Sequence, residues 1–149
     1  MPLRIRDYCE RTGQESPVEP AAVARCILES LALKHRQTLE LLREATGHAP
    51  SEVHVVGGGS RNELLCQWTA DATGIPALAG PAEATEVGNL VVQAIALGEL
   101  SSVQEGRELV EASFPLRVHE PHETSEWQDA RERFAAIVAR PEVGEGIEA

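Results

Sequence analysis

The sequence contains very few aromatic residues: two phenylalanines, two tryptophans and one tyrosine in 149 residues. Its hydrophobic core must therefore consist of leucine, valine, isoleucine and alanine, as is typical of helices packed on a buried sheet. No apolar run is long enough to cross a bilayer, and the charged first residues do not form a signal peptide. We therefore expect no membrane partner, a cytoplasmic location, and one domain or part of one.

Basic residues are also scarce, since 13 lysines and arginines stand against 24 acidic residues and give a formal net charge of −11. Nucleic acids and anionic membranes bind basic surfaces, so the composition argues against both as partners. A small anion is not excluded, because a local group of backbone N–H donors can bind phosphate within an acidic protein.

Cysteine pairs and metal-ligand spacings are absent. Cys9, Cys26 and Cys66 are widely separated, with no C-x-x-C motif, which indicates reduced thiols in a cytoplasmic protein. His119 and His122 lie three residues apart, but no cysteine is near them. We therefore predict that the chain binds no metal ion through its own side chains.

The most informative segment is VHVVGGGSRNELL, residues 53–65. It predicts a strand, a glycine turn and the start of a helix, with Ser60 and Glu63 in the spacing of a capping box. Such a turn exposes backbone donors and the positive end of a helix to an anion, and glycine permits close approach of a ligand. Three glycines can equally form only a tight connection, so both interpretations stay open at this point.

The remaining pattern predicts helices alternating with a few short strands. The order is a mixed stretch over 1–19, helix 20–46, strand 52–56, helix 61–73, strand 76–79, helix 85–98, helix 102–112, an extended segment 114–119, and a helix ending near 139. This is an α/β pattern with too few strands for a complete sheet, so we expect a piece of a larger fold. Residues 141–149 are acidic and contain glycine, which predicts a disordered tail.

Residues 53–89, VHVVGGGSRNELLCQWTADATGIPALAGPAEATEVGN, closely resemble the C-terminal lobe of the FGGY carbohydrate kinases. Supporting similarity is found in MPLRIRDYCERTGQ (1–14), RCILESLALKHR (25–36) and GPAEATEVGN (80–89). The resemblance covers most of residues 1–138 and, within the family, is strongest to members that phosphorylate L-rhamnulose. It implies a partial C-terminal lobe of the actin-like ATPase (ribonuclease H-like) fold over 1–140, with helices packed on a small sheet.

The resemblance also implies the ligand and the residues that bind it. In FGGY kinases, ATP lies between two lobes and its γ-phosphate passes to a sugar hydroxyl, which here implies conversion of L-rhamnulose and ATP to L-rhamnulose 1-phosphate and ADP. Asn62 matches an asparagine directed towards adenine, a role that suits an amide able to donate and accept; the alternative is a solvated residue of the first helical turn. The implied nucleotide-binding residues are Gly57, Gly58, Gly59 and Asn62.

A second group of residues is expected to shape the pocket wall without direct contact. Gly88 would allow its helix to pack close to a neighbour, whereas Glu83 and Glu86 could simply favour a helix N-terminus. Glu86 and His35 depart from the family pattern, and Glu86 leaves the local polarity of the pocket open. The implied pocket-shaping residues are Ser60, Gly80, Pro81, Glu83, Thr85, Gly88 and Asn89.

The family's catalytic aspartate, its Mg²⁺ ligands and most of its sugar contacts have no counterpart in this chain. Because phosphoryl transfer depends on positioning and charge stabilisation, we assign no catalytic residue and expect the chain alone to be inactive. Two alternatives stay open: another FGGY kinase acting on xylulose, fuculose or glycerol, and a non-catalytic nucleotide-binding or interaction module. An apolar face left uncovered by the missing lobe could also support a homodimer.

Overall fold

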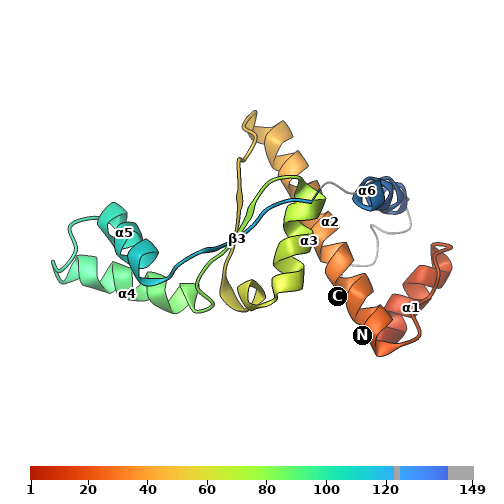
Figure 1. Cartoon of the computed structure of the whole chain (residues 1–149), viewed down its shortest axis with the longest axis horizontal. Coiled ribbons are helices and arrows are strands. Elements are labelled where there is room, and N and C mark those ends of the chain that lie inside the picture. Colours follow the sequence, from red (N-terminus) through yellow and green to blue (C-terminus); the bar gives the residue numbers. More distant parts are fainter. Residues whose placement is uncertain (123–124, 141–149) are drawn as a thin grey trace.

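The computed structural model of the chain describes residues 1–122 and 125–140, which form helices around one short-stranded sheet (Figure 1). The elements are α1 (Pro2–Arg11), α2 (Pro20–Thr46), β1 (Val53–Val55), the 3₁₀-helix η1 (Gly57–Arg61), α3 (Glu63–Thr73), β2 (Ala77–Ala79), α4 (Ala84–Ala96), α5 (Val103–Ser113), β3 (Arg117–His119) and α6 (Ser125–Val138). The predicted tail at 141–149 lies outside the described residues.

The sheet has the order β1-β2-β3 and is mixed. Strands β1 and β2 are parallel, with Val53 opposite Ala77, whereas β2 and β3 are antiparallel, with Ala77 opposite His119. The sequence predicted β1 and β2 and only an extended conformation for the third segment. Pairing with β2 makes that segment a strand, because a strand needs a hydrogen-bonded neighbour and sequence pattern alone does not supply one.

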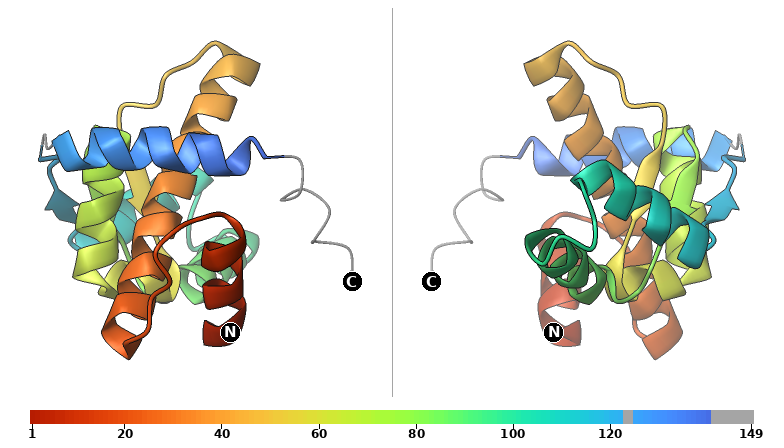
Figure 2. Two further views of the ribbon diagram at one scale, coloured as in Figure 1. Left: turned by 90° about the vertical axis from the view of Figure 1, so that its right-hand side faces the viewer. Right: turned by 90° about the vertical axis from the view of Figure 1, so that its left-hand side faces the viewer.

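The core lies where α3 packs between α2 and the sheet. Ala32 of α2 and Cys66 and Ala70 of α3 have no exposed surface, and the same holds for Ala77 of β2. Small side chains at these positions let the two helices and the strand approach closely. Figure 2 shows α6 lying across α2 and α3, and residues of α6 contact both helices. The glycine turn directly precedes α3 and therefore lies next to this core.

Local stop signals set the helix ends as predicted. Gly47 and Gly74 follow α2 and α3 in the left-handed conformation, with φ angles of 71° and 74°. Their N–H groups donate to the carbonyl oxygens of Arg43 and Ala70 at 2.8 Å. Glycine suits this position because a Cβ makes the left-handed conformation costly.

The first helix, α1, was not predicted, since the sequence indicated only a mixed stretch over 1–19. Cys9 is the buried residue of α1, and Pro2 stands in its first turn. Half of the residues in α1 are charged, so the segment has few apolar residues to mark it as a helix that packs on a core. Arg6 ties α1 to the following loop, donating from Nε to the carbonyl oxygen of Pro17 at 2.9 Å and from its guanidinium to Val18.

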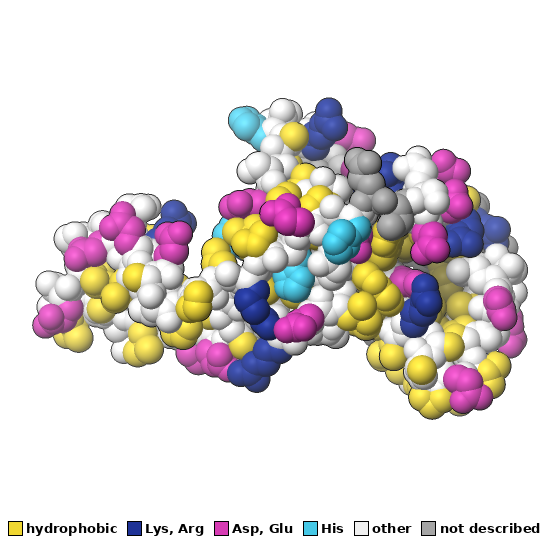
Figure 3. Space-filling model, viewed as in Figure 1, with side chains coloured by type: hydrophobic (Ala, Val, Ile, Leu, Met, Phe, Trp, Pro, Cys, Tyr) yellow, Lys and Arg dark blue, Asp and Glu magenta, His cyan; other side chains and the backbone are white. Residues whose placement is uncertain are grey.

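Helices α4 and α5 extend to one side of the sheet, opposite the side that carries α1 and α6 (Figure 1). Gly106 of α5 faces Val91 of α4 so closely that a Cβ would overlap the valine side chain. Val87 and Val91 of α4 are half-buried, whereas Leu90 is 64% exposed. Apolar side chains are visible on this pair of helices in Figure 3.

No described helix has the length and apolar character needed to cross a membrane. The three cysteines all lie among the described residues, and each is a free thiol.

His35 joins α2 to α3 through the buried hydroxyl of Thr69. Its Nδ1 lies 3.1 Å from Thr69 Oγ1, and that hydroxyl donates its proton to the carbonyl oxygen of Leu65 at 2.8 Å. Nδ1 must therefore carry a hydrogen and donate. Burial lowers the pKa of His35 below its usual value, because it disfavours the charged imidazolium.

Protonation of His35 is expected to destabilise the chain as the pH falls. Between the lowered folded pKa and the unfolded value of about 6.5, the unfolded chain binds more protons. The stabilising contribution is therefore complete above the unfolded pKa and is lost as the pH falls through this window. Urea unfolding at about pH 7.5 and about pH 5.5 should show a smaller pH-dependent loss in His35→Gln than in the unmodified chain. An equal loss would contradict the prediction, and His48→Gln, at an exposed position just after α2, is the control.

Candidate functional site

The glycine turn connects β1 to α3 and begins at Gly57. Gly57 has a φ angle of +75°, which favours glycine, and its N–H donates to the carbonyl oxygen of Pro81 at 3.0 Å. Gly58 and Gly59 follow on the exposed side, and a Cβ at Gly58 would meet no atom within 4 Å. The turn is a 3₁₀-helix rather than an open loop.

The predicted capping box at the start of α3 is wrong. Asn62 is the N-cap, in an extended conformation, and its Oδ1 accepts from the N–H of Leu65 at 3.0 Å. Ser60 lies inside the 3₁₀-helix and is 1% exposed, and its hydroxyl donates to the carbonyl oxygen of Gly57 at 2.8 Å. A capping residue must stand outside helical geometry, so the extra helical turn moves the cap from Ser60 to Asn62.

Asn62 therefore caps α3. The sequence had suggested a contact with adenine or a solvated residue of the first helical turn, and neither of these interpretations included the cap. Its Oδ1 is already engaged with Leu65, and its side chain is exposed. The amide nitrogen keeps its two hydrogens for another partner. Asn62 can still donate to a ligand, and one of the two lone pairs of its Oδ1 is already used within the protein.

A buried thiol contacts the backbone of the glycine turn. Cys66 has no exposed surface, and its Sγ lies 3.8 Å from the carbonyl oxygens of both Gly59 and Ser60. Burial raises the pKa of the Cys66 thiol, an effect larger than the opposing influence of Arg117. The thiol therefore keeps its proton and acts as a weak donor.

The second motif starts directly beside the first. The N–H of Gly80 donates to the carbonyl oxygen of Val55 at 2.9 Å, and a Cβ on Gly80 would lie 3.2 Å from Val56 Cγ1. A larger residue at position 80 would require Val56 to shift by a few tenths of an ångström, because the two segments are this close. Glu83 forms an ion pair with Arg61 of the turn. The structure therefore brings Gly80, Pro81 and Glu83 together with the glycine turn.

The rest of the second motif lies on α4 and is exposed: Thr85, Gly88 and Asn89. A Cβ on Gly88 would meet no atom within 4 Å, so the close helix contact expected there does not occur among the described residues. Glu83 precedes α4 but makes no side-chain capping bond, because its carboxylate faces Arg61. Glu86 stands in the first turn of α4, where a negative charge is favourable.

Sequence reasoning missed Arg117, which lies on β3. Its guanidinium donates to the carbonyl oxygen of Ser60 at 2.9 Å and to Glu63 Oε1 at 2.8 Å. These partners are more than 50 residues away in the sequence, at separations of 57 and 54. No local pattern marks such a residue, because only the pairing of β3 with β2 brings it to the turn.

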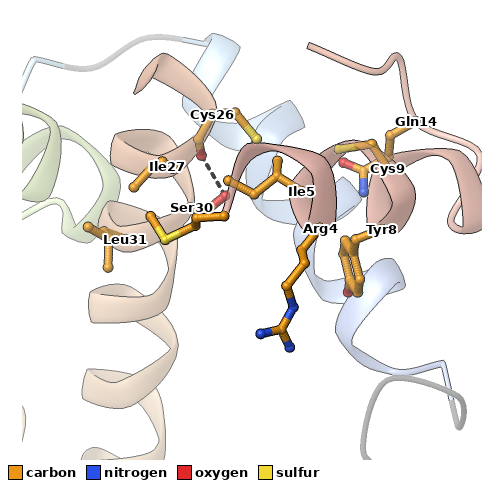
Figure 4. Close-up of a pocket in the computed structure, with 10 residues that line it drawn as sticks. Arg4, Ile5, Tyr8, Cys9, Gln14, Cys26, Ile27, Ser30 and Leu31 are labelled. Atoms are coloured by element: carbon orange, nitrogen blue, oxygen red, sulfur yellow. Dashed lines mark hydrogen bonds between the residues drawn. The ribbon is translucent and has the colours of Figure 1, made fainter. Parts of the chain in front are cut away.

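A separate cavity of about 600 Å³ lies between α1 and α2, and Figure 4 shows the side chains around it. Tyr8, Cys9 and Cys26 are among its lining residues, and Ser30 Oγ donates to the carbonyl oxygen of Cys26 at 2.7 Å. None of the residues of the glycine turn lines this cavity.

No three or more histidine, cysteine, aspartate or glutamate side chains among the described residues are grouped so that they could hold a metal ion. His122 and Asp71 form a histidine–carboxylate contact that is structural. His122 donates its backbone N–H to Asp71 Oδ1 at 2.8 Å, and Gln67 Nε2 donates to the same oxygen at 2.9 Å. These bonds hold the segment after β3 against α3.

The glycine turn, the mixed sheet and the surrounding helices form an α/β domain. The model of the FGGY family of carbohydrate kinases, C-terminal domain, matches residues 1–97. The chain belongs to the FGGY family of carbohydrate kinases.

Two bacterial rhamnulokinases are similar to nearly the whole chain. The chain is 46% identical over 138 residues to a rhamnulokinase of Bacteroides thetaiotaomicron, covering 93% of this chain and 28% of that protein. It is 43% identical over 139 residues to a rhamnulokinase of Pectobacterium atrosepticum, with the same coverage of 93% and 28%. The chain thus spans little more than a quarter of the length of these curated relatives.

A solved structure supports the fold. The crystal structure of a xylulose kinase from Rhodospirillum rubrum matches with a TM-score of 0.64 over 85% of this chain and 26% of that chain, at 22% identity. The predicted fold, a partial C-terminal lobe of the actin-like ATPase type with helices on a small sheet, is confirmed. The predicted family resemblance is confirmed as well.

Proposed function

We propose that this chain is the C-terminal, nucleotide-binding part of an ATP-dependent sugar kinase whose acceptor is L-rhamnulose. The reaction of the whole enzyme would convert L-rhamnulose and ATP to L-rhamnulose 1-phosphate and ADP. The observation that carries the proposal is the 43–46% identity to rhamnulokinases across nearly the whole chain, glycine turn included. We place residues 1–140 in the distal part of this lobe, and the enzyme in the cytoplasm.

The geometry of the turn supports nucleotide binding at Gly57, Gly58, Gly59 and Asn62. The exposed glycines carry no side chain that would keep a ligand from the backbone. The first N–H groups of a helix have no partner within that helix, and anions are favoured there. Asn62 beside them retains an amide donor, which suits a ring nitrogen of adenine.

The second motif forms one wall of the proposed pocket. The carbonyl oxygen of Pro81 accepts from the N–H of Gly57, and the N–H of Gly80 donates to the carbonyl oxygen of Val55 at the end of β1. The ion pair between Arg61 and Glu83 joins the two segments at the surface. We propose that Ser60, Gly80, Pro81 and Glu83 shape the pocket through these contacts, and that Thr85, Gly88 and Asn89 face the missing part of the enzyme.

The catalytic base, the Mg²⁺ ligands and the main sugar contacts would come from the part of the enzyme that this chain does not contain. Mg²⁺ would neutralise charge on the transferred phosphate there. This chain would contribute binding and orientation of the nucleotide, and closure of the cleft would exclude water. By itself the chain should bind nucleotide weakly and transfer no phosphate.

An ADP titration followed by backbone amide NMR tests the proposal. Saturable shifts are expected at Gly57–Asn62, with a Kd of about 1 mM because half of the cleft is absent. Adenosine, which lacks the phosphates, should shift Asn62 more than the glycines. A folded sample without saturable shifts at the turn would contradict nucleotide binding by this chain.

A further inference from the structure

Arg117 forms two hydrogen bonds to the segment that contains the glycine turn. It stands on β3, outside the 1–97 segment that the family model matches. One arm of its guanidinium reaches the carbonyl oxygen of Ser60 in a partly buried bond of 2.9 Å. The other arm reaches Glu63 in the first turn of α3 at 2.8 Å. Arg117 therefore bridges the end of the 3₁₀-helix and the start of α3.

Three carbonyl oxygens of the turn, those of Gly57, Gly59 and Ser60, accept hydrogen bonds. Gly57 accepts from the Ser60 hydroxyl, and Gly59 accepts from the N–H of Asn62 at 3.1 Å and from the Cys66 thiol. The carbonyl oxygen of Ser60 accepts from Arg117 and from the same thiol. The Arg117 bond is the strongest of those to Ser60, because its donor is charged and the thiol is a weak donor.

Fixing a carbonyl also fixes the N–H on the other side of the same peptide unit. A trans peptide is planar, so its C=O and the following N–H point in opposite directions. The bond from Ser60 to Gly57 therefore directs the N–H of Gly58 away from the body. The bond from Arg117 to Ser60 fixes the peptide that joins Ser60 to Arg61 and, through it, the position of Asn62.

We propose that Arg117 is a positioning residue for nucleotide binding: it anchors the glycine turn so that the N–H of Gly58 and the amide of Asn62 are presented to the ligand. This inference rests on the proposed function. A role in positioning can be distinguished from an effect of the positive charge, because Glu63 already pairs with the Arg117 guanidinium. A lysine would keep the charge but could not reach both partners with the planar fork of arginine.

Four variants of the chain test the role: Arg117→Gln, Arg117→Lys, Glu63→Gln and Arg11→Gln. Glu63→Gln removes the charge partner but leaves the bond to Ser60, and Arg11 forms an exposed ion pair with Asp7 on α1, far from the turn in sequence. The readouts are the ADP Kd and the amide exchange rates of residues 58–62 without ligand. Both Arg117 variants should weaken ADP binding about three- to tenfold and speed exchange at the turn. Glu63→Gln should change the Kd by less than about twofold, and Arg11→Gln should not change it.

Each other result overturns the inference in a distinguishable way. Arg117→Gln with unchanged ADP affinity and unchanged exchange would refute positioning and leave the proposed function standing. Full rescue by Arg117→Lys would show that charge acts instead of geometry. Faster exchange throughout α2 and α3 would show a general structural role. An unmodified chain that does not bind ADP would remove the proposed function and this inference together.

Discussion

Gly58→Val is expected to weaken ADP binding at least about tenfold, a change of about 1.4 kcal/mol in binding free energy, while the chain remains folded. A Cβ at Gly58 would meet no atom within 4 Å, and its φ lies outside the left-handed region. The free protein therefore has room for the valine. The side chain would fill the space through which a phosphate must approach the backbone N–H groups.

The matched controls separate this steric block from damage to the fold. Gly58→Ala adds one methyl group and should give an intermediate loss of affinity. Ala96→Val adds similar bulk to an exposed position at the end of α4 and should leave ADP binding unchanged. Circular dichroism and the melting temperature confirm that each variant is folded. If Gly58→Val binds ADP as tightly as the unmodified chain, the turn does not contact the nucleotide.

Leu65→Ala is expected to lower the free energy of unfolding by about 2–5 kcal/mol, which is the usual cost of removing a buried leucine. Leu65 is 9% exposed on α3, and its Cδ2 lies 4.0 Å from where a Cβ on Gly59 would stand. The cavity left by the substitution would open directly beneath the glycine turn. The neighbouring side chains in this core, such as that of Ala70, are too short to fill the cavity.

The adjacent Leu64 gives the matched control, because it lies on the same helix and is 46% exposed. Leu64→Ala removes the same atoms from a position in contact with solvent, so it should cost less than about 1 kcal/mol. Urea unfolding of the two variants measures the difference. Equal losses at the two positions would contradict the packing of α3 on α2 described above.

The two expectations concern different parts of one short segment. Gly58 lies on the exposed side of the turn, where a change should affect ligand affinity and little else. Leu65 lies on the buried side of α3, where a change should affect stability first. The link between them is the set of hydrogen bonds to the turn from Ser60, Cys66 and Arg117. A rigid core below the turn would keep the exposed amides in place for a ligand.

Features that depend only on neighbouring residues could be predicted from the sequence. Glycine adopts a left-handed conformation at low cost wherever it stands, so Gly47 and Gly74 ended their helices as predicted. The strand before the glycines and the helix after them were predicted for the same local reason. The resemblance in residues 53–89 also identified the family, because those residues carry its pattern.

Features that depend on residues far apart in the sequence could be seen only in the tertiary structure. Ser60 and Asn62 both have side chains able to cap a helix, and the extra turn of 3₁₀-helix, held by Ser60, Cys66 and Arg117, selected Asn62. The third strand became a strand only by pairing with β2. Arg117 reached Ser60 across 57 residues of chain, a contact that no local pattern could indicate. Hydrogen bonds and packing between distant segments form only when the whole fold brings them together, and this is why the sequence located the turn but not what supports it.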